Sequence, residues 1–182
     1  MKSRDKRVFI VHGWASSPLD CWFPWLTHEL EKKGFRVIAP YMPDPKYPNI
    51  VEWVKTLEKV VGVPDDKTYF VGHSLGCHVM LKYLETLPEG TKVGGGVCVA
   101  GHIVRKDGSR VNTEKIKKNG IQIRGLFSDN DYYIDPGEVG QFREELGAEA
   151  KTLHEMGHFS RRENITQLPE ALDMVLEIAK EG

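Results

Sequence analysis

The sequence predicts an α/β protein in which a mostly parallel sheet of about six strands is covered by helices on both faces. Two observations lead to this prediction. Short apolar segments alternate with amphipathic helical segments along the whole chain, and such alternation is typical of parallel sheets. The chain has 182 residues, which is enough for one domain with a substantial core and too few for two comfortable ones. We therefore expect one domain over residues 1–182, built as a three-layer sandwich.

Six short runs rich in apolar residues are the expected strands. They occupy residues 7–11, 35–39, 68–71, 93–99, 121–127 and 149–153. Three glycines in the fourth run indicate that this strand packs closely under a helix. Ligands of such sheets bind outside the carboxyl ends of the strands, so the functional groups are expected in the segments that follow these runs.

Segments with helical periodicity separate the strands. They are expected at residues 21–33, from the cap Asn49 through Val61, and at 75–87, 138–146 and 168–180. The first carries an apolar stripe made of Trp22, Trp25, Leu26 and Leu30. Two irregular segments complete the pattern: a proline-rich loop at residues 40–48 and a small hairpin at 103–111 around an Asp-Gly turn.

Composition narrows the classes of function. The formal net charge is −1 and no long block of like charges occurs, so we expect no nucleic-acid partner. No apolar stretch approaches the length of a membrane span or a signal-peptide core, so we expect no membrane association. The three cysteines are widely spaced and odd in number, which indicates free thiols and a cytoplasmic protein. No protein partner is evident from the sequence.

The most informative segment is Gly72-His73-Ser74-Leu75-Gly76, which places the pattern G-x-S-x-G between a strand and a helix. Small residues are needed at both ends of this pattern because the backbone turns sharply and a Cβ would crowd the turn. The turn lifts the Ser74 hydroxyl clear of the sheet, and the helix N-terminus points amide donors at any developing oxyanion. The pattern therefore predicts a nucleophilic serine.

A serine hydroxyl needs a neighbouring base, and the base needs an acid that orients it. After a nucleophile turn of this kind, the acid and then a histidine follow in the chain. Asp129 and Asp131 both qualify as the acid, since both follow the fifth strand. Asp131 is favoured because it lies a few residues beyond the strand, before an apolar residue and a turn. His158, in a turn after the last strand, is the expected base.

The oxyanion needs two main-chain amides, one from the residue after the nucleophile and one from the loop after the first strand. Leu75 supplies the first, and Trp14 or Ala15 is expected to supply the second. His12 is expected to brace this loop, and His73 either lines the site or supports the turn.

Several residues near these groups are expected to border the substrate. They are His12, Gly13, Trp14, His73, Tyr132 and Phe159. Trp22 and Trp25 could also border an acyl pocket, but their helical spacing favours the core face of their helix.

A second motif competes for the same region. His154-Glu155-Met156-Gly157-His158 matches H-E-x-x-H, the pattern of zinc proteases, and Glu177 lies at a suitable separation for a third ligand. That motif requires a helix, so that two histidines four residues apart share one face. The preceding residues alternate like a strand, and glycine weakens a helix by about 1 kcal/mol relative to alanine. We therefore expect no metal site here.

Longer motifs carry a family resemblance. The segments HGWASSPLDCWFPWL, VIAPYMPDP, FVGHSLG, KIKKNGIQIRGLFSDNDYYID and GHF span nearly the whole chain. In these motifs the chain resembles the small α/β-hydrolases of the retinoblastoma-binding-protein 9 and YdeN type. The resemblance implies an α/β-hydrolase fold with six core strands and no large lid. It also implies a catalytic triad on Ser74, Asp131 and His158.

Together these observations predict a serine hydrolase without a cofactor. The expected activity is that of a carboxylesterase on small esters with short acyl chains, because the chain has no room for a large cap over the site. Two alternatives stay open. One is a non-catalytic protein-interaction module on the same fold, and the other is a thioesterase or amidase, since one triad serves all of these reactions.

Overall fold

All six strands of the sheet are parallel in the computed structural model, which describes residues 5–181. The strands are β1 (Arg7–Val11), β2 (Arg36–Ile38), β3 (Thr68–His73), β4 (Gly95–Val99), β5 (Ile123–Ser128) and β6 (Glu149–Leu153). Their spatial order is β2-β1-β3-β4-β5-β6. The chain therefore runs from β1 to one edge and then crosses back to build the other side. Ligands of open α/β sheets bind where the strand order reverses, which here is between the carboxyl ends of β1 and β3.

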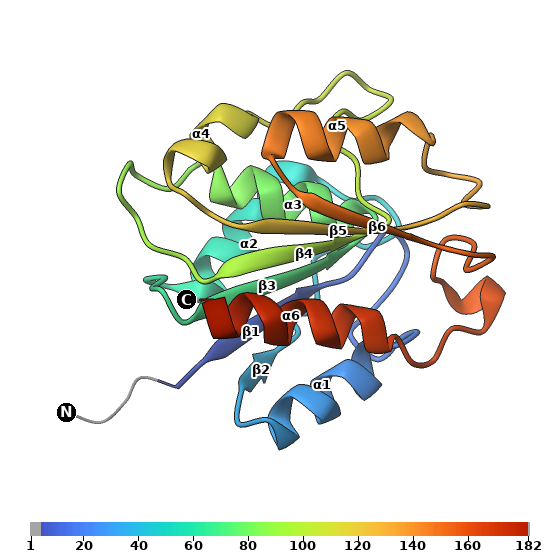
Figure 1. Cartoon of the computed structure of the whole chain (residues 1–182), viewed down its shortest axis with the longest axis horizontal. Helices are drawn as coiled ribbons and strands as arrows, with labels where there is room; N and C mark the ends of the chain where they lie inside the picture. The colour runs from blue at the N-terminus through green and yellow to red at the C-terminus, as the bar shows by residue number, and fades with distance from the viewer. Residues whose placement is uncertain (1–4, 182) are drawn as a thin grey trace.

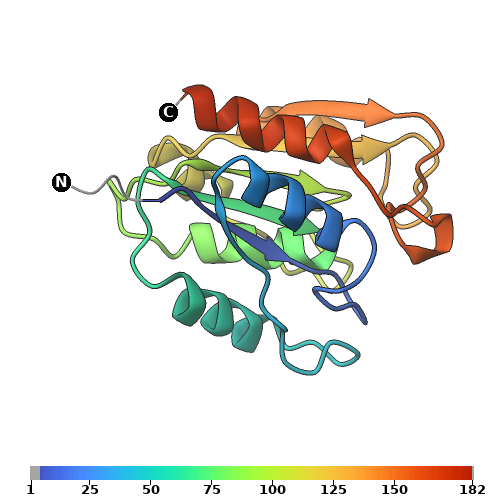
Figure 2. The ribbon, with the colours of Figure 1, turned by 90° about the horizontal axis from the view of Figure 1, so that it is seen from below.

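Helices cover both faces of this sheet (Figure 1). They are α1 (Phe23–Lys32), α2 (Ile50–Val61), α3 (Leu75–Leu84), α4 (Thr113–Lys118), α5 (Gly137–Leu146) and α6 (Pro169–Glu181), with a 3₁₀-helix at Arg161–Glu163. Buried side chains of α1 and α6 share one core cluster with the sheet, and those of α2 to α5 share the other. Figure 2 shows the first face, with α1 and α6 in front of the strands.

Residues 8–11 of β1 form an unbroken apolar run because both faces of this strand are buried. Phe9 and Val11 belong to the core cluster on the α2 to α5 side, and Val8 and Ile10 belong to the cluster on the α1 and α6 side. All four side chains are at most 1% exposed. Burial of each such side chain contributes roughly 1.5–3 kcal/mol. A strand buried on both faces has no polar face to alternate with, as is usual in parallel sheets.

The predicted three-layer α/β architecture is confirmed, and the sheet is fully parallel. Helix α4 was not expected, because its six residues form a short, polar segment. Its N-cap is Asn112, whose side chain accepts a hydrogen bond from the Lys115 N–H (3.3 Å). Ile116, only 1% exposed, anchors it to the core. Because a helix this short is marginal alone, tertiary packing decides its formation and little periodicity is visible in the sequence.

The hairpin expected at residues 103–111 is reduced to one antiparallel bridge between Val104 and Arg110. The Arg105 N–H also donates to the Ser109 carbonyl (2.8 Å), which closes the turn. No large lid domain is formed within residues 5–181. Among the same residues, no helix has both the length and the apolar character required to span a bilayer.

Candidate active site

Ser74 occupies the sharp turn between β3 and α3, with the strained backbone angles φ 53° and ψ −118°. The flanking glycines are needed for the close packing of this turn. A Cβ on Gly72 would lie 2.6 Å from the Cα of Cys77, and a Cβ on Gly76 would overlap the carbonyl oxygen of Val11. Non-glycine residues in such conformations occur mainly where the surrounding structure fixes them, often at functional sites. The turn therefore holds the Ser74 hydroxyl in place beyond the end of β3.

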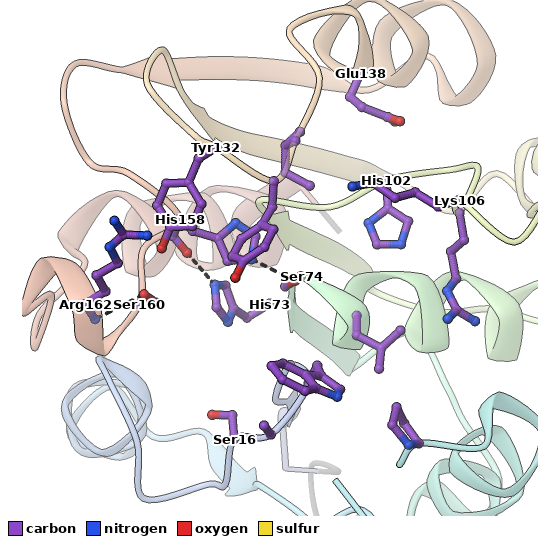
Figure 3. A pocket seen from close by; sticks show the side chains of 18 of the residues that line it. Ser16, His73, Ser74, His102, Lys106, Tyr132, Glu138, His158, Ser160 and Arg162 are labelled. Carbon is purple, nitrogen blue, oxygen red and sulfur yellow. Dashed lines mark hydrogen bonds between the residues drawn. The ribbon is translucent and has the colours of Figure 1, made fainter. Parts of the chain in front are cut away.

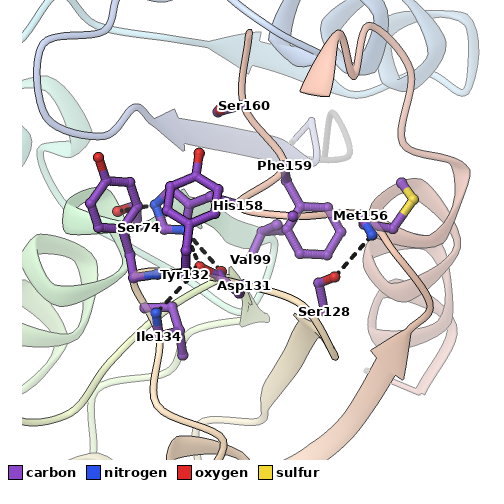
Figure 4. Close-up of polar contacts among 12 residues, drawn as sticks. Ser74, Val99, Ser128, Asp131, Tyr132, Ile134, Met156, His158, Phe159 and Ser160 are labelled. Carbon is purple, nitrogen blue, oxygen red and sulfur yellow. Dashed lines mark hydrogen bonds and ion pairs between the residues drawn. The ribbon is translucent and has the colours of Figure 1, made fainter. Parts of the chain in front are cut away.

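Three side chains from distant parts of the chain meet beyond the strand ends (Figure 4). The Nε2 of His158 lies 2.8 Å from the Ser74 hydroxyl oxygen. Its Nδ1 lies 2.9 and 3.0 Å from the two carboxylate oxygens of Asp131. These contacts place a proton on Nδ1 of His158, and this N–H donates to the carboxylate. The Nε2 atom is then free to accept the proton of the serine hydroxyl. The side chains of Asp131 and His158 are 2% and 8% exposed, which shields their pairing from solvent.

Asp131 is the aspartate that reaches the histidine, and Asp129 is not. The Asp131 carboxylate also accepts hydrogen bonds from the N–H groups of Tyr133 (2.8 Å) and Ile134 (3.3 Å), which fix its orientation. Asp129 instead pairs with His154 at 2.6 Å. The turn at residues 129–130 directs the two carboxylates to different histidines, and the acid that reaches His158 is the one the sequence favoured.

The loop that carries His158 is held by hydrogen bonds to side chains of the segment 128–130, at and just after the end of β5. Positive φ values occur at Glu155 (56°) and Phe159 (53°), where the side chain makes them strained, and at Gly157 (54°), where glycine permits them. Three consecutive main-chain N–H groups in it donate to side chains of that segment: Glu155 to Asp129 (2.9 Å), Met156 to Ser128 (2.9 Å) and Gly157 to Asn130 (2.7 Å). With Asp131 on His158, the four consecutive residues 128–131, of which the first ends β5, each contact this loop.

Two carbonyl groups of the same loop are held from the other side. His73 Nε2–H donates to the carbonyl oxygen of His158 (2.8 Å), and the Trp22 indole N–H donates to that of Phe159 (3.1 Å). Burial, followed by the proximity of His158, lowers the pKa of His73 to about 4. His73 is therefore neutral near pH 7 and supports the backbone of His158 as a hydrogen-bond donor.

The main-chain amides suited to hold an oxyanion are those of Trp14 and Leu75. Leu75 is the first residue of α3, so its N–H has no acceptor within the helix. Among the hydrogen bonds of residues 5–181, neither the Leu75 N–H nor the Trp14 N–H has an acceptor. The expectation for Ala15 is wrong, because its N–H donates to the Pro45 carbonyl (2.7 Å). Gly13 lets this loop approach the nucleophile, since a Cβ there would lie 3.3 Å from the Ser74 Cβ.

A pocket of about 1010 Å³ opens onto the Ser74 hydroxyl (Figure 3). Of the residues expected to border substrate, Gly13, Trp14, His73 and Tyr132 line it. Phe159 does not: its side chain is fully buried in the core cluster shared with α1 and α6. The backbone at Phe159 has a positive φ, and its ring points into the core, whereas the neighbouring His158 lines the pocket. Trp22, also fully buried, belongs to that core cluster, and Trp25 packs against it.

His12 does not line the pocket either. Its Nδ1–H donates to the Gly13 carbonyl (2.9 Å), and its Nε2 accepts from the Met42 N–H (3.1 Å). Burial lowers the pKa of His12, and the Gly13 contact only partly opposes this effect. The side chain therefore braces the loop after β1, as the sequence indicated, and the expectation that it also contacts substrate is wrong.

The far side of the pocket is formed by residues that sequence reasoning did not identify. His102, Arg105 and Lys106 come from the segment after β4, and Glu138 comes from α5. Arg105 is paired with Asp107 at 3.0 Å, and burial raises the pKa of Glu138. The position of His102 just after the end of β4 could have marked it as a pocket residue, because ligands of such sheets bind beyond the carboxyl ends of the strands. No local pattern marks Glu138, because its place is set by how α5 packs.

The segment with the H-E-x-x-H pattern does not form a helix. His154 and His158 contact different carboxylates, Asp129 and Asp131, and therefore do not share one face. Glu177 pairs with Arg124 on α6 and β5. Within residues 5–181, no group of three or more His, Cys, Asp or Glu side chains is arranged to hold a metal ion.

The fold and the serine turn define an α/β-hydrolase, and comparison with known proteins specifies the family. The family model described as "Serine hydrolase" matches residues 8–177. The chain therefore belongs to the serine hydrolase family, and we conclude that the protein is a hydrolase of this family.

Similar proteins are found in bacteria and mammals. YdeN of Bacillus subtilis is 28% identical over 179 residues, covering 93% of this chain and 94% of YdeN. Serine hydrolase RBBP9 of Rattus norvegicus is 27% identical over 175 residues, covering 90% of this chain and 91% of RBBP9. The crystal structure of the B. subtilis ydeN gene product superposes with a TM-score of 0.90 at 26% identity, covering 96% of this chain and 99% of that chain.

Proposed function

We propose that this protein is a carboxylesterase that acts on small esters through a covalent acyl-enzyme on Ser74. The observation that carries the proposal is the continuous chain of contacts from the Ser74 hydroxyl through His158 to Asp131. A hydroxyl becomes a competent nucleophile when a base accepts its proton and an acid stabilises the charged base. The arrangement requires no metal or cofactor for these proton movements.

In the first half of the reaction, the Ser74 oxygen attacks the ester carbonyl as its proton moves to the Nε2 of His158. The carbonyl oxygen becomes an oxyanion that accepts hydrogen bonds from the N–H groups of Trp14 and Leu75. One such donor typically contributes about 2.7–4 kcal/mol to transition-state stabilisation. The tetrahedral intermediate then collapses, and the C–O bond to the alcohol breaks. The Nε2 proton of His158 passes to the departing alkoxide, which leaves an acylated Ser74 and a free alcohol.

In the second half, a water molecule takes the place of the alcohol. His158 accepts a proton from this water, whose oxygen attacks the acyl carbonyl. The second tetrahedral intermediate expels the Ser74 oxygen, which recovers its proton from His158. The products are a carboxylic acid and the original enzyme. Throughout the cycle, Asp131 remains ionised and orients the imidazole.

We further propose a preference for short acyl chains, which rests on the absence of a large lid within residues 5–181. The pocket volume of about 1010 Å³ lies at the upper end of the usual range for ligand pockets. The room beyond the acyl group would then take the alcohol part of the ester. Rates across a p-nitrophenyl ester series from acetate to decanoate test this preference. Highest kcat/KM on the longest chains would contradict it.

A fluorophosphonate probe tests the catalytic role of Ser74 directly, because it forms a covalent bond only with an activated serine. We expect labelling and ester hydrolysis by the wild type, and loss of both in Ser74→Ala and His158→Ala. Absence of labelling in the folded wild type would favour a non-catalytic interaction module. Thioester and small amide substrates in the same panel separate an esterase from a thioesterase or amidase.

A further inference from the structure

The carboxylate of Glu163 connects the two segments that carry the acid and the base. Its Oε1 accepts a hydrogen bond from the Tyr132 hydroxyl (2.9 Å). Its Oε2 accepts from both the main-chain N–H (3.0 Å) and the hydroxyl (2.6 Å) of Ser160. Tyr132 directly follows Asp131, and Ser160 lies two residues after His158. The Glu163 side chain thus connects the segment after β5 to the segment after β6. This connection lies beside Asp131 and His158, which must stay in contact for the proposed reaction.

The aliphatic part of Glu163 also packs against the backbone just before the histidine. A Cβ on Gly157 would overlap the Cγ of Glu163. Phe159, directly after His158, has a positive φ that is strained for a residue with a Cβ, so the backbone beside the histidine needs external support. Side chains after β5 supply this support on the N-terminal side. On the C-terminal side, Glu163 holds the Ser160 N–H.

Glu163 acts here as an anion. Burial alone would raise its pKa, but the hydrogen bonds from Ser160 and Tyr132 outweigh burial, and the pKa lies below its usual value. Hydrogen bonds to an ionised acceptor are about twice as strong as those between neutral groups. The guanidinium of Arg162 lies 4.6 Å from the centre of the Tyr132 ring, which further fixes the ring whose hydroxyl reaches Glu163.

We propose that Glu163 is a positioning residue for the reaction at Ser74: it holds the imidazole of His158 within reach of both Asp131 and the serine hydroxyl. Glu163 is not among the residues that line the pocket, so it acts through His158 and not on the substrate. The proposal rests on the esterase function proposed above. It assigns a role to the capping box of the 3₁₀-helix, in which Ser160 and Glu163 cap each other.

Hydrogen–deuterium exchange tests the geometric part without any substrate. We compare wild type, Glu163→Ala and Glu163→Gln with the control Glu155→Ala, which removes a carboxylate of 73% side-chain exposure from the same loop. In Glu163→Ala, we expect the Ser160 and Gly157 amides to exchange about tenfold faster or more, as follows from loss of a charge-assisted hydrogen bond. Exchange in the core strands β1 and β3 stays unchanged. Exchange at Ser160 equal to that of the control would overturn the proposal.

Kinetics on a p-nitrophenyl ester test the functional part. We expect Glu163→Ala to lower kcat roughly 10- to 100-fold with KM within about threefold of the wild type. Glu163→Gln keeps one acceptor oxygen and should recover part of the loss, and Tyr132→Phe should lose less than Glu163→Ala. A kcat equal to that of Glu155→Ala, or a general loss of stability with faster exchange in β1 and β3, would overturn the proposal. If the folded wild type does not react with fluorophosphonate, the esterase function fails, while the exchange data still decide whether Glu163 holds the loop.

Discussion

His73 donates a hydrogen bond to the carbonyl oxygen of His158, so the residue beside the nucleophile holds the backbone of the proposed base. The two rings also lie close, with centroids 5.2 Å apart. His73 therefore links the turn after β3 to the loop after β6, and a shift of either would move both partners of the proton transfer together. Its Nδ1 is buried without a hydrogen-bond partner among the described residues, so the contact of Nε2 with His158 is the side-chain hydrogen bond of His73 in this part of the chain.

The first prediction concerns this contact. His73→Leu removes the donor and should lower kcat roughly 10- to 100-fold, because an unpaired buried carbonyl is expected to cost about 1–3 kcal/mol and to loosen the loop. His73→Gln places an amide N–H at a similar reach and should retain more activity. Steady-state kinetics on both variants decide it. Equal kcat values for His73→Leu and the wild type would show that the contact has no functional weight.

The second prediction separates the two aspartates after β5. Asp131→Asn should lower kcat by about 10⁴-fold, because an asparagine in this position favours the wrong histidine tautomer. Asp129→Asn changes a carboxylate that is 44% exposed and contacts His154, and it should lower kcat less than tenfold. The two substitutions are chemically identical and lie two residues apart, so each controls for the other. A larger loss in Asp129→Asn would reverse the assignment of the acid.

Some of this site could be predicted because it depends on local chemistry. A glycine-flanked turn between a strand and a helix requires small residues, so Ser74 was visible in the sequence. His158 was predicted because it follows the last strand. The brace at Glu163 was also readable, since a serine followed three residues later by glutamate is a capping-box pattern. That pattern is a weak signal here, because only a single 3₁₀ turn directly follows it.

Other features depend on contacts between distant segments. The Ala15 amide is taken by Pro45, a residue of an irregular proline-rich loop whose path no periodicity encodes. Phe159 follows the histidine directly, yet its ring lies in the core because the backbone there has a positive φ. Residues of this kind are placed by packing, so sequence order alone misassigns them.

The third prediction contrasts two glycines. Gly76→Ala should prevent or strongly destabilise folding, because the new Cβ would overlap the Val11 carbonyl oxygen at the carboxyl end of β1. Gly140→Ala in α5 meets no atom within 4 Å and should raise the free energy of unfolding by about 0.4–1 kcal/mol. Urea denaturation followed by circular dichroism measures both. A stability loss in Gly140→Ala similar to that in Gly76→Ala would show that close packing at Gly76 is not the cause.

The fourth prediction concerns stability at acidic pH. Burial is the largest cause that lowers the pKa of His73, His78 and His102 to about 4 in the folded protein, compared with 6.5 for an ordinary histidine. Above pH 6.5, these residues are neutral in both states. As the pH falls from 6.5 to 4, the unfolded chain binds protons that the folded protein does not bind. The free energy of unfolding should therefore decrease across this window.

The contribution of fully buried His73 alone should reach roughly 3 kcal/mol at pH 4. Carboxylates also titrate near this pH, so the comparison of variants isolates the histidine. The experiment measures the free energy of unfolding at half-unit steps from pH 4 to 7.5 for the wild type, His73→Gln and His28→Gln. His28, an exposed histidine on α1, serves as the control. His73→Gln should lose less stability than the wild type between pH 6.5 and 4, because it removes one group that only the unfolded chain protonates. His28→Gln should follow the wild-type curve. If His73→Gln instead follows the wild-type curve at every pH, His73 is not held neutral by the fold, and its role as a donor to His158 would have to be reassigned.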